Sequence, residues 1–293
     1  MMISEKAGTF AAFMFGVSVF LCAAETDCAA WWSFDEGTGE SFADSSGNSN
    51  SGTLFYFDTN TQYRVDGRRG KAIRMNGVDN LLDAGNGASL NITNMITLCA
   101  WVQFNALPDQ TGDPCIVGKW DVENSKCSWF LGSEYGKLAA GISPSGLKSD
   151  AFTVRAVMLI TNDDGSVEED DGIPMDVWMH VAMTCDGRVL SLYTNGLLSA
   201  IDTNREYTPI FSDPDTSVYI GRAHGNNTPS MSRSAAVRVT TGTGKNMTTT
   251  VVVAPKRTVN SGFRTLDAAI DEVRVYKRVL SGKEIAHIYR SGK

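Results

Sequence analysis

The stretch that most constrains the fold is VWMHVAMTCDGRVLSLYTNGLLSAI, which covers residues 177–201. It contains three apolar runs of strand length, and the dipeptides Asp186-Gly187 and Asn195-Gly196 separate them. Asp-Gly and Asn-Gly favour the positive φ angles of two-residue type I′ turns, which join antiparallel strands. The stretch therefore predicts a three-strand antiparallel meander.

The rest of the chain after Trp31 has the same character. Short β-prone runs are separated by Gly, Asn and Asp, and no helical pattern alternates with them as a parallel α/β sheet would require. The sequence therefore predicts an all-β fold, a two-sheet antiparallel jelly-roll sandwich. Further strands are expected at 71–75, 80–84, 96–104, 115–120, 128–131, 137–142, 152–161, 217–221 and 270–276.

One short helix is expected near the C-terminus. Ser281 is a good N-cap, and Glu284 three residues later completes a capping box. Leu280 and Ile285 occupy the two positions of a hydrophobic staple. We expect this helix to cover an edge or an end of the sandwich.

The first residues have the composition of a signal peptide. Lys6 precedes the uncharged apolar run FAAFMFGVSVFL at residues 10–21, and small residues follow at Cys22–Ala24. The run is too short for a comfortable membrane span, and no later run resembles one. We therefore expect residues 1–24 to be a signal peptide and residues 25–293 to form one domain that is secreted or held at the cell surface. A buried N-terminal helix is the alternative.

Export permits disulfide bonds. Removal of residues 1–24 would leave five cysteines, Cys28, Cys99, Cys115, Cys127 and Cys185, whereas cleavage after Ala30 would leave four. The sequence does not choose a pairing among them. Free buried thiols are the alternative interpretation.

Charge is distributed unevenly along the chain. The net charge of -7 and the pI near 5.0 argue against nucleic acid as a general partner. Two segments, near 147–173 and 224–262, are interpreted as insertions. The first contains the acidic run NDDGSVEEDD, for which we expect a solvated loop, and the second is basic and could form a hairpin around Gly242–Asn246. Such a basic segment could attract an anionic polymer, although a solvated loop with scattered charge explains it more simply.

Several motifs occur in a recognisable order. They are WWSFDEGTGESFADSSGNSNSGTL, GKAIRMNG, ITLCAWVQF, IVGKW, WMHVAMTCDGRVLSLYTNG, VYIGR and AAIDEVRVYKRVLSGKEI. Together they resemble the laminin-G-like, concanavalin A-like jelly-roll domain of secreted bacterial proteins, from Trp31 to Tyr289. The resemblance implies two curved antiparallel sheets packed face to face, and recognition of polysaccharide or glycoprotein glycans. Fold resemblance does not by itself establish function.

The carboxylates argue against glycoside hydrolysis. β-Glucanases of this architecture carry Glu-x-Asp-x-Glu on one strand, where alternation presents all three acids to the substrate. No such run occurs in this chain. Asp271 and Glu272 are neighbours in a predicted strand, so alternation is expected to point them to opposite faces. His180 lies inside the meander and is interpreted as a structural, hydrogen-bonded histidine.

A calcium site is the better supported role for Asp271. If Val273 and Val275 face the core, alternation points Asp271 inward, and a buried carboxylate is costly unless a cation or several N–H groups compensate it. The resemblance implies a structural Ca²⁺ held by the Asp271 carboxylate, with backbone carbonyls around Asp35 and Gly77. The alternative is that Asp271 caps backbone amides while Glu272 pairs with Arg274 on the surface.

Exposed aromatic rings are the usual stacking surfaces for sugars. Trp120, Trp129 and Tyr135 flank predicted loops and are the candidate ligand-binding residues. We therefore predict an exported, noncatalytic carbohydrate-binding or adhesion module with a structural calcium ion. The alternatives are a glycan-active hydrolase or lyase of the same superfamily and a surface or matrix module that binds proteins.

Overall fold

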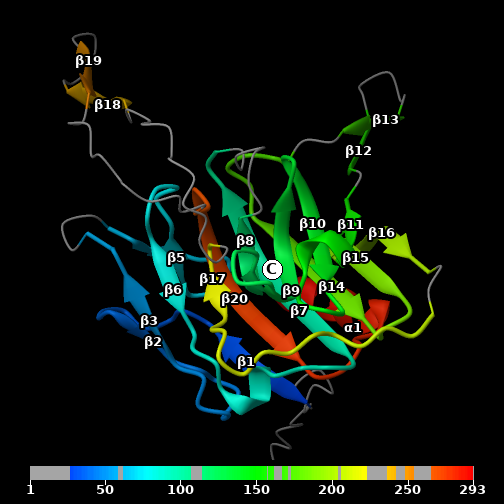
Figure 1. Cartoon of the computed structure of the whole chain (residues 1–293). Helices are drawn as coiled ribbons and strands as arrows, with labels where there is room; N and C mark the ends of the chain where they lie inside the picture. The colour runs from blue at the N-terminus through cyan, green and yellow to red at the C-terminus, as the bar shows by residue number, and fades with distance from the viewer. Residues whose placement is uncertain are drawn as a thin grey trace, which may run out of the picture.

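The computed structural model shows a sandwich of two antiparallel sheets with one terminal helix (Figure 1). It describes residues 27–58, 62–106, 114–156, 158–161, 167–170, 173–203, 206–222, 236–241, 248–253 and 265–292. The predicted signal peptide therefore lies outside the described residues. Within them, no helix is long and apolar enough to cross a membrane.

We call the two large sheets sheet A and sheet B. In spatial order, sheet A contains β16 (Leu197–Asp202), β15 (Leu190–Thr194), β14 (Met179–Cys185), β7 (Ile96–Phe104), β20 (Ala268–Tyr276), β5 (Lys71–Arg74) and β4 (Arg64–Asp66), and β1 (Cys28–Trp32) also pairs with β20. Sheet B contains β11 (Phe152–Arg155), β10 (Lys137–Ile142), β9 (Lys126–Glu134), β8 (Cys115–Asp121), β17 (Tyr219–Ile220), β6 (Leu81–Asp83), β3 (Gly52–Phe55) and β2 (Ser41–Phe42). Short 3₁₀ turns lie at η2 (Ala88–Leu90) and η3 (Lys148–Asp150). The prediction of an antiparallel two-sheet sandwich is confirmed.

The predicted meander forms β14, β15 and β16, which pair in antiparallel register. Asn195 and Gly196 have φ angles of 50° and 80° and form the expected two-residue turn between β15 and β16. The other predicted turn is wrong, because four residues separate β14 from β15. There the Asp186 carboxylate accepts hydrogen bonds from the Arg188 and Val189 amides at 2.8 and 2.7 Å, which stabilises a longer loop.

The main core lies between the sheets and follows strand alternation. In β7, the inward residues Ile96, Leu98, Ala100, Val102 and Phe104 belong to it. The intervening residues point to the outer face of sheet A, where Cys99 packs in a second cluster with residues of the helix α1 (Gly282–Ser291). Alternation therefore gives sheet A two apolar faces, and α1 covers part of the outer one.

Both inserted segments contain hairpins. β18 (Ala236–Thr241) pairs with β19 (Thr248–Val253), which confirms the hairpin expected around Gly242–Asn246. β12 (Met158–Thr161) pairs with β13 (Val167–Asp170), so the prediction that the acidic run is entirely loop is wrong. In this hairpin Glu168 and Glu169 pair with the apolar residues Ile160 and Leu159 rather than with other acidic residues.

The five cysteines among the described residues form no disulfide bonds. Four of them are buried, and Cys28 is half-buried. Burial raises the pKa of the Cys99 thiol to about 12, which keeps it protonated and unreactive. The described residues therefore match the alternative interpretation of buried thiols rather than the disulfide interpretation.

The helix α1 has the predicted capping box. The Ser281 hydroxyl accepts a hydrogen bond from the Glu284 amide at 3.3 Å, and the Ser281 amide donates to the Glu284 carboxylate at 2.8 Å. Replacing Ser281 with Ala should lower the free energy of unfolding by about 1 kcal/mol, because a helical N–H loses its acceptor. Urea denaturation would measure this. The exposed substitution Lys283→Ala on the same helix is the control, expected to change it by less than about 0.5 kcal/mol.

Candidate functional site

The structure places a bulge at Asp271 and Glu272 in β20. Asp271 pairs with Trp101 of β7, but the next paired residue, Arg274, lies opposite Cys99. Two residues of β20 therefore oppose one residue of β7. Glu272 adopts a left-handed backbone conformation, with φ of 53°, which is rare for a residue other than glycine.

The bulge changes where the two carboxylates point. Ile270, Val273 and Val275 all belong to the main core. Because Asp271 directly follows the inward Ile270, its side chain faces away from the core, and the expectation that it shares a face with Val273 is wrong. The expectation that Asp271 and Glu272 lie on opposite faces assumed an unbroken strand and fails for the same reason.

Glu272 has the predicted partner in an unexpected setting. Its carboxylate forms an ion pair with Arg274 and accepts a hydrogen bond from the Trp31 indole N–H at 3.1 Å. The Arg274 guanidinium also lies over the Trp31 ring, 4.5 Å from its centroid. Glu272 is only 4% exposed, so this ion pair is buried rather than on the surface.

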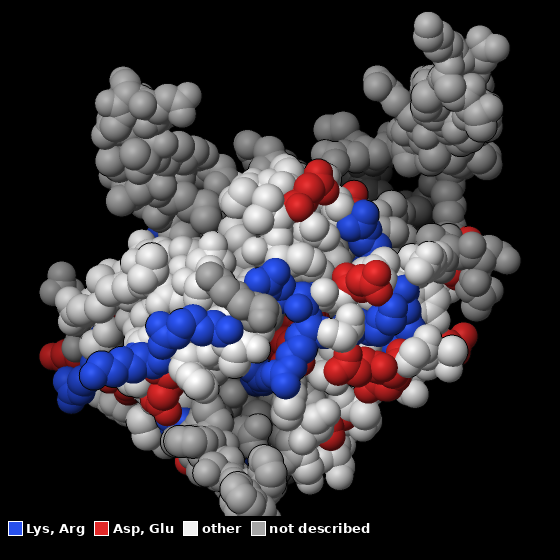
Figure 2. Space-filling model, turned by 180° about the vertical axis from the view of Figure 1, so that it is seen from behind, with Lys and Arg blue, Asp and Glu red and all other residues white. Residues whose placement is uncertain are grey.

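The rear face of the molecule carries clusters of Lys and Arg side chains with acidic groups between them (Figure 2).

Asp271 lies beneath the turn that joins β4 to β5. Its Oδ2 accepts a hydrogen bond from the Arg69 amide at 2.8 Å, while its buried Oδ1 has no hydrogen-bond partner among the described residues. A Cβ atom on Gly67 would lie 2.7 Å from Oδ2, so the turn approaches this closely only because the residue is glycine.

The predicted companion Asp35 reaches the same turn. Its Oδ1 accepts a hydrogen bond from the Lys71 amide at 2.8 Å, and a Cβ atom on Gly70 would lie 1.9 Å from that oxygen. The preceding residue, Phe34, is left-handed with φ of 59° and directs the chain out of the core. We call Asp35, Asp271 and the turn 67–70 the carboxylate junction.

Gly77 does not belong to the junction. Its amide donates to the carbonyl of Leu266, five residues before Asp271, which is roughly 17 Å along an extended strand. The resemblance implied that an early turn would lie beside Asp271. In this structure that turn is formed by residues 67–70 and not by Gly77. Within the described residues, no three His, Cys, Asp or Glu side chains gather as a metal-binding group.

Burial dominates the electrostatics of the junction. It raises the pKa of Asp271 from 3.8 to about 7, the Arg69 hydrogen bond opposes this rise, and the charges of Glu272 and Asp35 add to it. A buried carboxylate oxygen without a donor, a second carboxylate nearby and a glycine turn folded onto both fit a hard cation with oxygen ligands. Backbone carbonyl and water oxygens would have to complete its coordination.

The three candidate aromatic residues have different environments. Trp129 lies in the main core, and Trp120 packs against Phe130 on the other face of sheet B with its ring centroid 4.7 Å away. Both tryptophans are at most 1% exposed, so neither offers a ring face to a sugar in this structure. Strand residues next to loops were expected at the surface, but the small neighbours on sheet B leave room for these large rings.

Tyr135 is 63% exposed. With Gly136 it forms the two-residue turn between β9 and β10, with φ angles of 53° and 78°. The Arg155 guanidinium lies over the Tyr135 ring, 5.4 Å from its centroid, and forms an ion pair with Glu134. Tyr135 therefore positions Arg155, which lines a groove on the edge of the sandwich.

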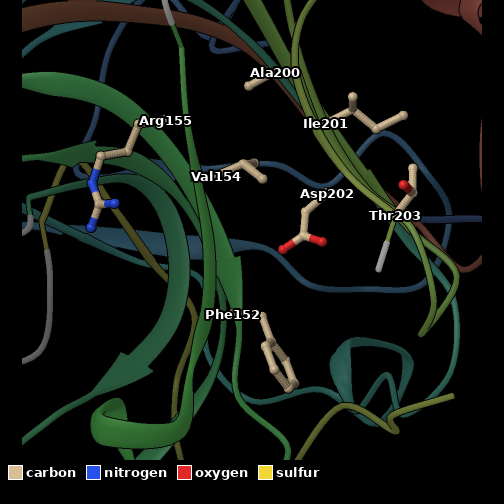
Figure 3. A pocket seen from close by; sticks show the side chains of 7 residues that line it. All are labelled: Phe152, Val154, Arg155, Ala200, Ile201, Asp202 and Thr203. Carbon is tan, nitrogen blue, oxygen red and sulfur yellow. The ribbon is translucent and has the colours of Figure 1, made fainter. Parts of the chain in front are cut away.

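This groove lies between the edge strands β11 and β16 and encloses about 650 Å³. The residues that line it are Phe152, Val154, Arg155, Ala200, Ile201, Asp202 and Thr203. Figure 3 shows Val154, Ala200 and Asp202 between the two strands, whereas Arg155 extends away from them. The lining combines apolar side chains with the Asp202 carboxylate, and most of the surface that it exposes to the groove is polar. The groove is open to solvent, and its volume lies within the range of small-molecule sites.

His180 does not have the predicted hydrogen bonds. It is 1% exposed, and neither ring nitrogen has a partner among the described residues. The ring packs against Trp101 at 5.4 Å between centroids. Burial, helped by the charge of Arg274, lowers the pKa of His180 to about 3. It is therefore a neutral packing residue under α1.

A sequence profile of the concanavalin A-like lectin/glucanases superfamily matches residues 76–239, more than half of the chain. This chain belongs to that superfamily. No curated protein sequence matches it.

Solved structures share the fold of this superfamily member. The binding domain of Paraclostridial Mosquitocidal Protein 1 is 17% identical over 91% of this chain, with a TM-score of 0.58. Domain 4 of an extracellular arabinanase from Geobacillus stearothermophilus, solved with arabinotriose, is 19% identical over 90% of this chain and 98% of its own, with a TM-score of 0.51. The binding domain of botulinum neurotoxin serotype G is 13% identical over 90% of this chain, with a TM-score of 0.57. This chain spans about half the length of the two toxin chains, 52% and 51%.

Sequence reasoning missed several residues of both sites in this concanavalin A-like domain. Gly67 and Gly70 in GRRG flank the carboxylate junction, and two glycines so close together are a readable turn signal. Phe152 and Asp202 line the groove, but they belong to strands of different sheets. No local pattern reports that they meet.

The junction predicts an unusual pH dependence for the metal-free domain. Asp271 has a raised pKa when folded, so its contribution to stability is present below pH 3.8 and is lost as the pH rises to about 7. Unfolding free energies measured in urea with a chelator should fall by on the order of 2 kcal/mol across this window. Asp271→Asn should remove that decline, and exposed Glu40→Gln should retain it. An equal decline in the Asp271 variant would contradict the assignment.

Proposed function

We propose that this domain is an exported, noncatalytic glycan-binding module whose ligand lies in the groove between β11 and β16. The observation that carries the proposal is the lining of the groove, in which the half-buried ring of Phe152 and the buried Val154 lie beside the carboxylate of Asp202. A sugar ring has an apolar C–H face and a rim of hydroxyls. Phe152 and Val154 suit the C–H face, and the Asp202 carboxylate suits the hydroxyl groups.

Arg155 lies at the margin of the groove, and its side chain extends away from the two strands (Figure 3). The Glu134 ion pair and the Tyr135 ring hold that side chain in place. A volume of about 650 Å³ accommodates a short oligosaccharide. Tyr135, which we predicted as a stacking residue, acts in this proposal mainly through Arg155.

Two structural relatives support a glycan ligand. The arabinanase domain was solved in complex with arabinotriose. Cell entry of botulinum neurotoxin type C, whose solved chain is 12% identical with a TM-score of 0.55, depends on interaction with two ganglioside molecules. These findings concern those two proteins. Arabinotriose and gangliosides are therefore the first ligands to test on this chain.

A glycan array probed with the chain, with and without calcium, should identify a bound oligosaccharide. Asp202→Asn should weaken binding of that oligosaccharide about tenfold in calorimetry, because a hydrogen bond to a charged group is lost. Glu40→Gln removes the same charge from an exposed site on another part of the surface and should bind as the parent does. Binding that is unchanged in the Asp202 variant would exclude the groove, and an array without any signal would contradict glycan binding.

We also propose that a structural calcium ion binds at the carboxylate junction. Asp271 and Asp35 would supply its charged ligands, and calcium would supply the positive charge that the buried Asp271 carboxylate lacks. The ion would thereby tie the end of β1, the turn 67–70 and β20 together. Its role would be stabilisation, because Asp271 is inaccessible to a substrate.

Calcium added to chelator-treated protein should therefore raise the melting temperature. At a hundredfold excess over Kd, the expected stabilisation is about 2.7 kcal/mol. Asp271→Asn should abolish the response and Asp35→Asn should weaken it, while Asp66→Asn, whose exposed carboxylate pairs with Lys71, should retain it. A melting temperature that does not respond to chelation or to calcium would refute the site.

A further inference from the structure

A pair of adjacent aromatic residues is exposed where β3 ends. Phe55 is 41% exposed and Tyr56 is 57% exposed, and their ring centroids are 6.3 Å apart. Successive residues of an extended strand point to opposite faces, so one of these rings should be turned toward the core. The Tyr56 ring departs from that alternation because the backbone of Tyr56 is left-handed, with φ of 64°.

A buried polar network holds Tyr56 in this conformation. The side-chain amide of Asn80 donates to the Tyr56 carbonyl at 2.9 Å, and Asn80 is itself 4% exposed. The Asn80 side-chain oxygen accepts from the Asn76 amide at 2.9 Å, and the Thr265 hydroxyl donates to the Asn80 carbonyl at 3.2 Å. An unfavourable backbone conformation that neighbours maintain so firmly is characteristic of functional sites.

Tyr219 lies on the same face of sheet B. It pairs with Asp83 of β6, which pairs in turn with Thr53 of β3. Thr53 and Phe55 are the exposed residues of β3, so the Tyr219 and Asp83 side chains share their outward face. The three strands lie side by side in the order β17-β6-β3 (Figure 1). We call Phe55, Tyr56 and Tyr219 the aromatic platform.

In the part of the chain that the structure describes, the charges beside the aromatic platform are mainly acidic. Burial, followed by the charge of Asp83, raises the pKa of Tyr219, so its hydroxyl stays protonated and can donate. Asp79 is 7% exposed, and its charge acts on Arg222, which is 4% exposed. Among the described residues beside the platform, these two carboxylates face one buried guanidinium, which disfavours an anionic ligand.

We propose that the aromatic platform is a second glycan site, which takes a neutral sugar residue. The rings of Tyr56 and Phe55 stack on the apolar face of the sugar, and the Asp83 carboxylate and the Tyr219 hydroxyl bind its hydroxyl groups. An acidic sugar is rejected by the carboxylates. Six strand-to-strand steps separate β3 from β11, so the platform lies roughly 29 Å from the groove, beyond the reach of one trisaccharide.

The test uses backbone amide NMR shifts of the chain titrated with arabinotriose, cellotriose and the acidic trisaccharide sialyllactose. The amides of Phe55, Tyr56 and Tyr219 should shift with at least one neutral probe and not with sialyllactose. Tyr56→Asn keeps a residue that tolerates positive φ and removes the ring, and it should weaken this local response about tenfold. Tyr219→Phe should weaken it less.

Tyr207→Asn is the control, because Tyr207 is also an exposed tyrosine and belongs to neither proposed site. It should leave the platform response within about twofold of the parent. Platform amides that no neutral probe shifts, or that sialyllactose shifts more strongly, would overturn the proposal, as would an unchanged response in Tyr56→Asn. Asp202→Asn separates the two sites, because it should affect only the groove.

Discussion

β20 is the strand on which the rest of the sandwich depends. It pairs with β7 on one side, and on the other side it pairs first with β5 and then with β1. The bulge at Asp271 and Glu272 lies where the partner changes from β5 to β1. The same irregularity turns both carboxylates away from the core. Pairing geometry therefore creates the buried carboxylate that we propose calcium neutralises.

Residues other than glycine with a left-handed backbone conformation recur at all three sites that we propose to bind ligands. Glu272 and Phe34 shape the carboxylate junction, Tyr135 holds Arg155 beside the groove, and Tyr56 brings two rings to one surface. Glu272 interrupts alternation within β20, and Tyr56 does so at the end of β3, whereas Tyr135 lies in the turn between β9 and β10. Hydrogen bonds or ion pairs hold Glu272 and Tyr56 in place, as expected where strain is used for function.

The glycan sites that we propose lie apart from the elements that stabilise the sandwich. The main core covers one face of sheet A and the helix α1 covers part of the other, and the buried carboxylates on that sheet are out of reach of a ligand. The groove instead uses the edges of both sheets, and the aromatic platform uses the outward face of sheet B. Fold relatives at 11–19% identity share the scaffold, and a shared scaffold does not by itself determine a ligand.

The sequence by itself determined the meander, the capped helix, the two-sheet architecture and the superfamily. These follow from periodicity, turn dipeptides and motif order, which are local or nearly so. Tertiary structure alone decided that Trp120 and Trp129 are buried, that Gly77 lies far from Asp271, and that Asp271 and Glu272 both turn outward. Burial depends on what the rest of the chain packs against, and the bulge in β20 depends on which strands flank it. Neither the burial nor the bulge can be predicted from the residues that are adjacent in the sequence.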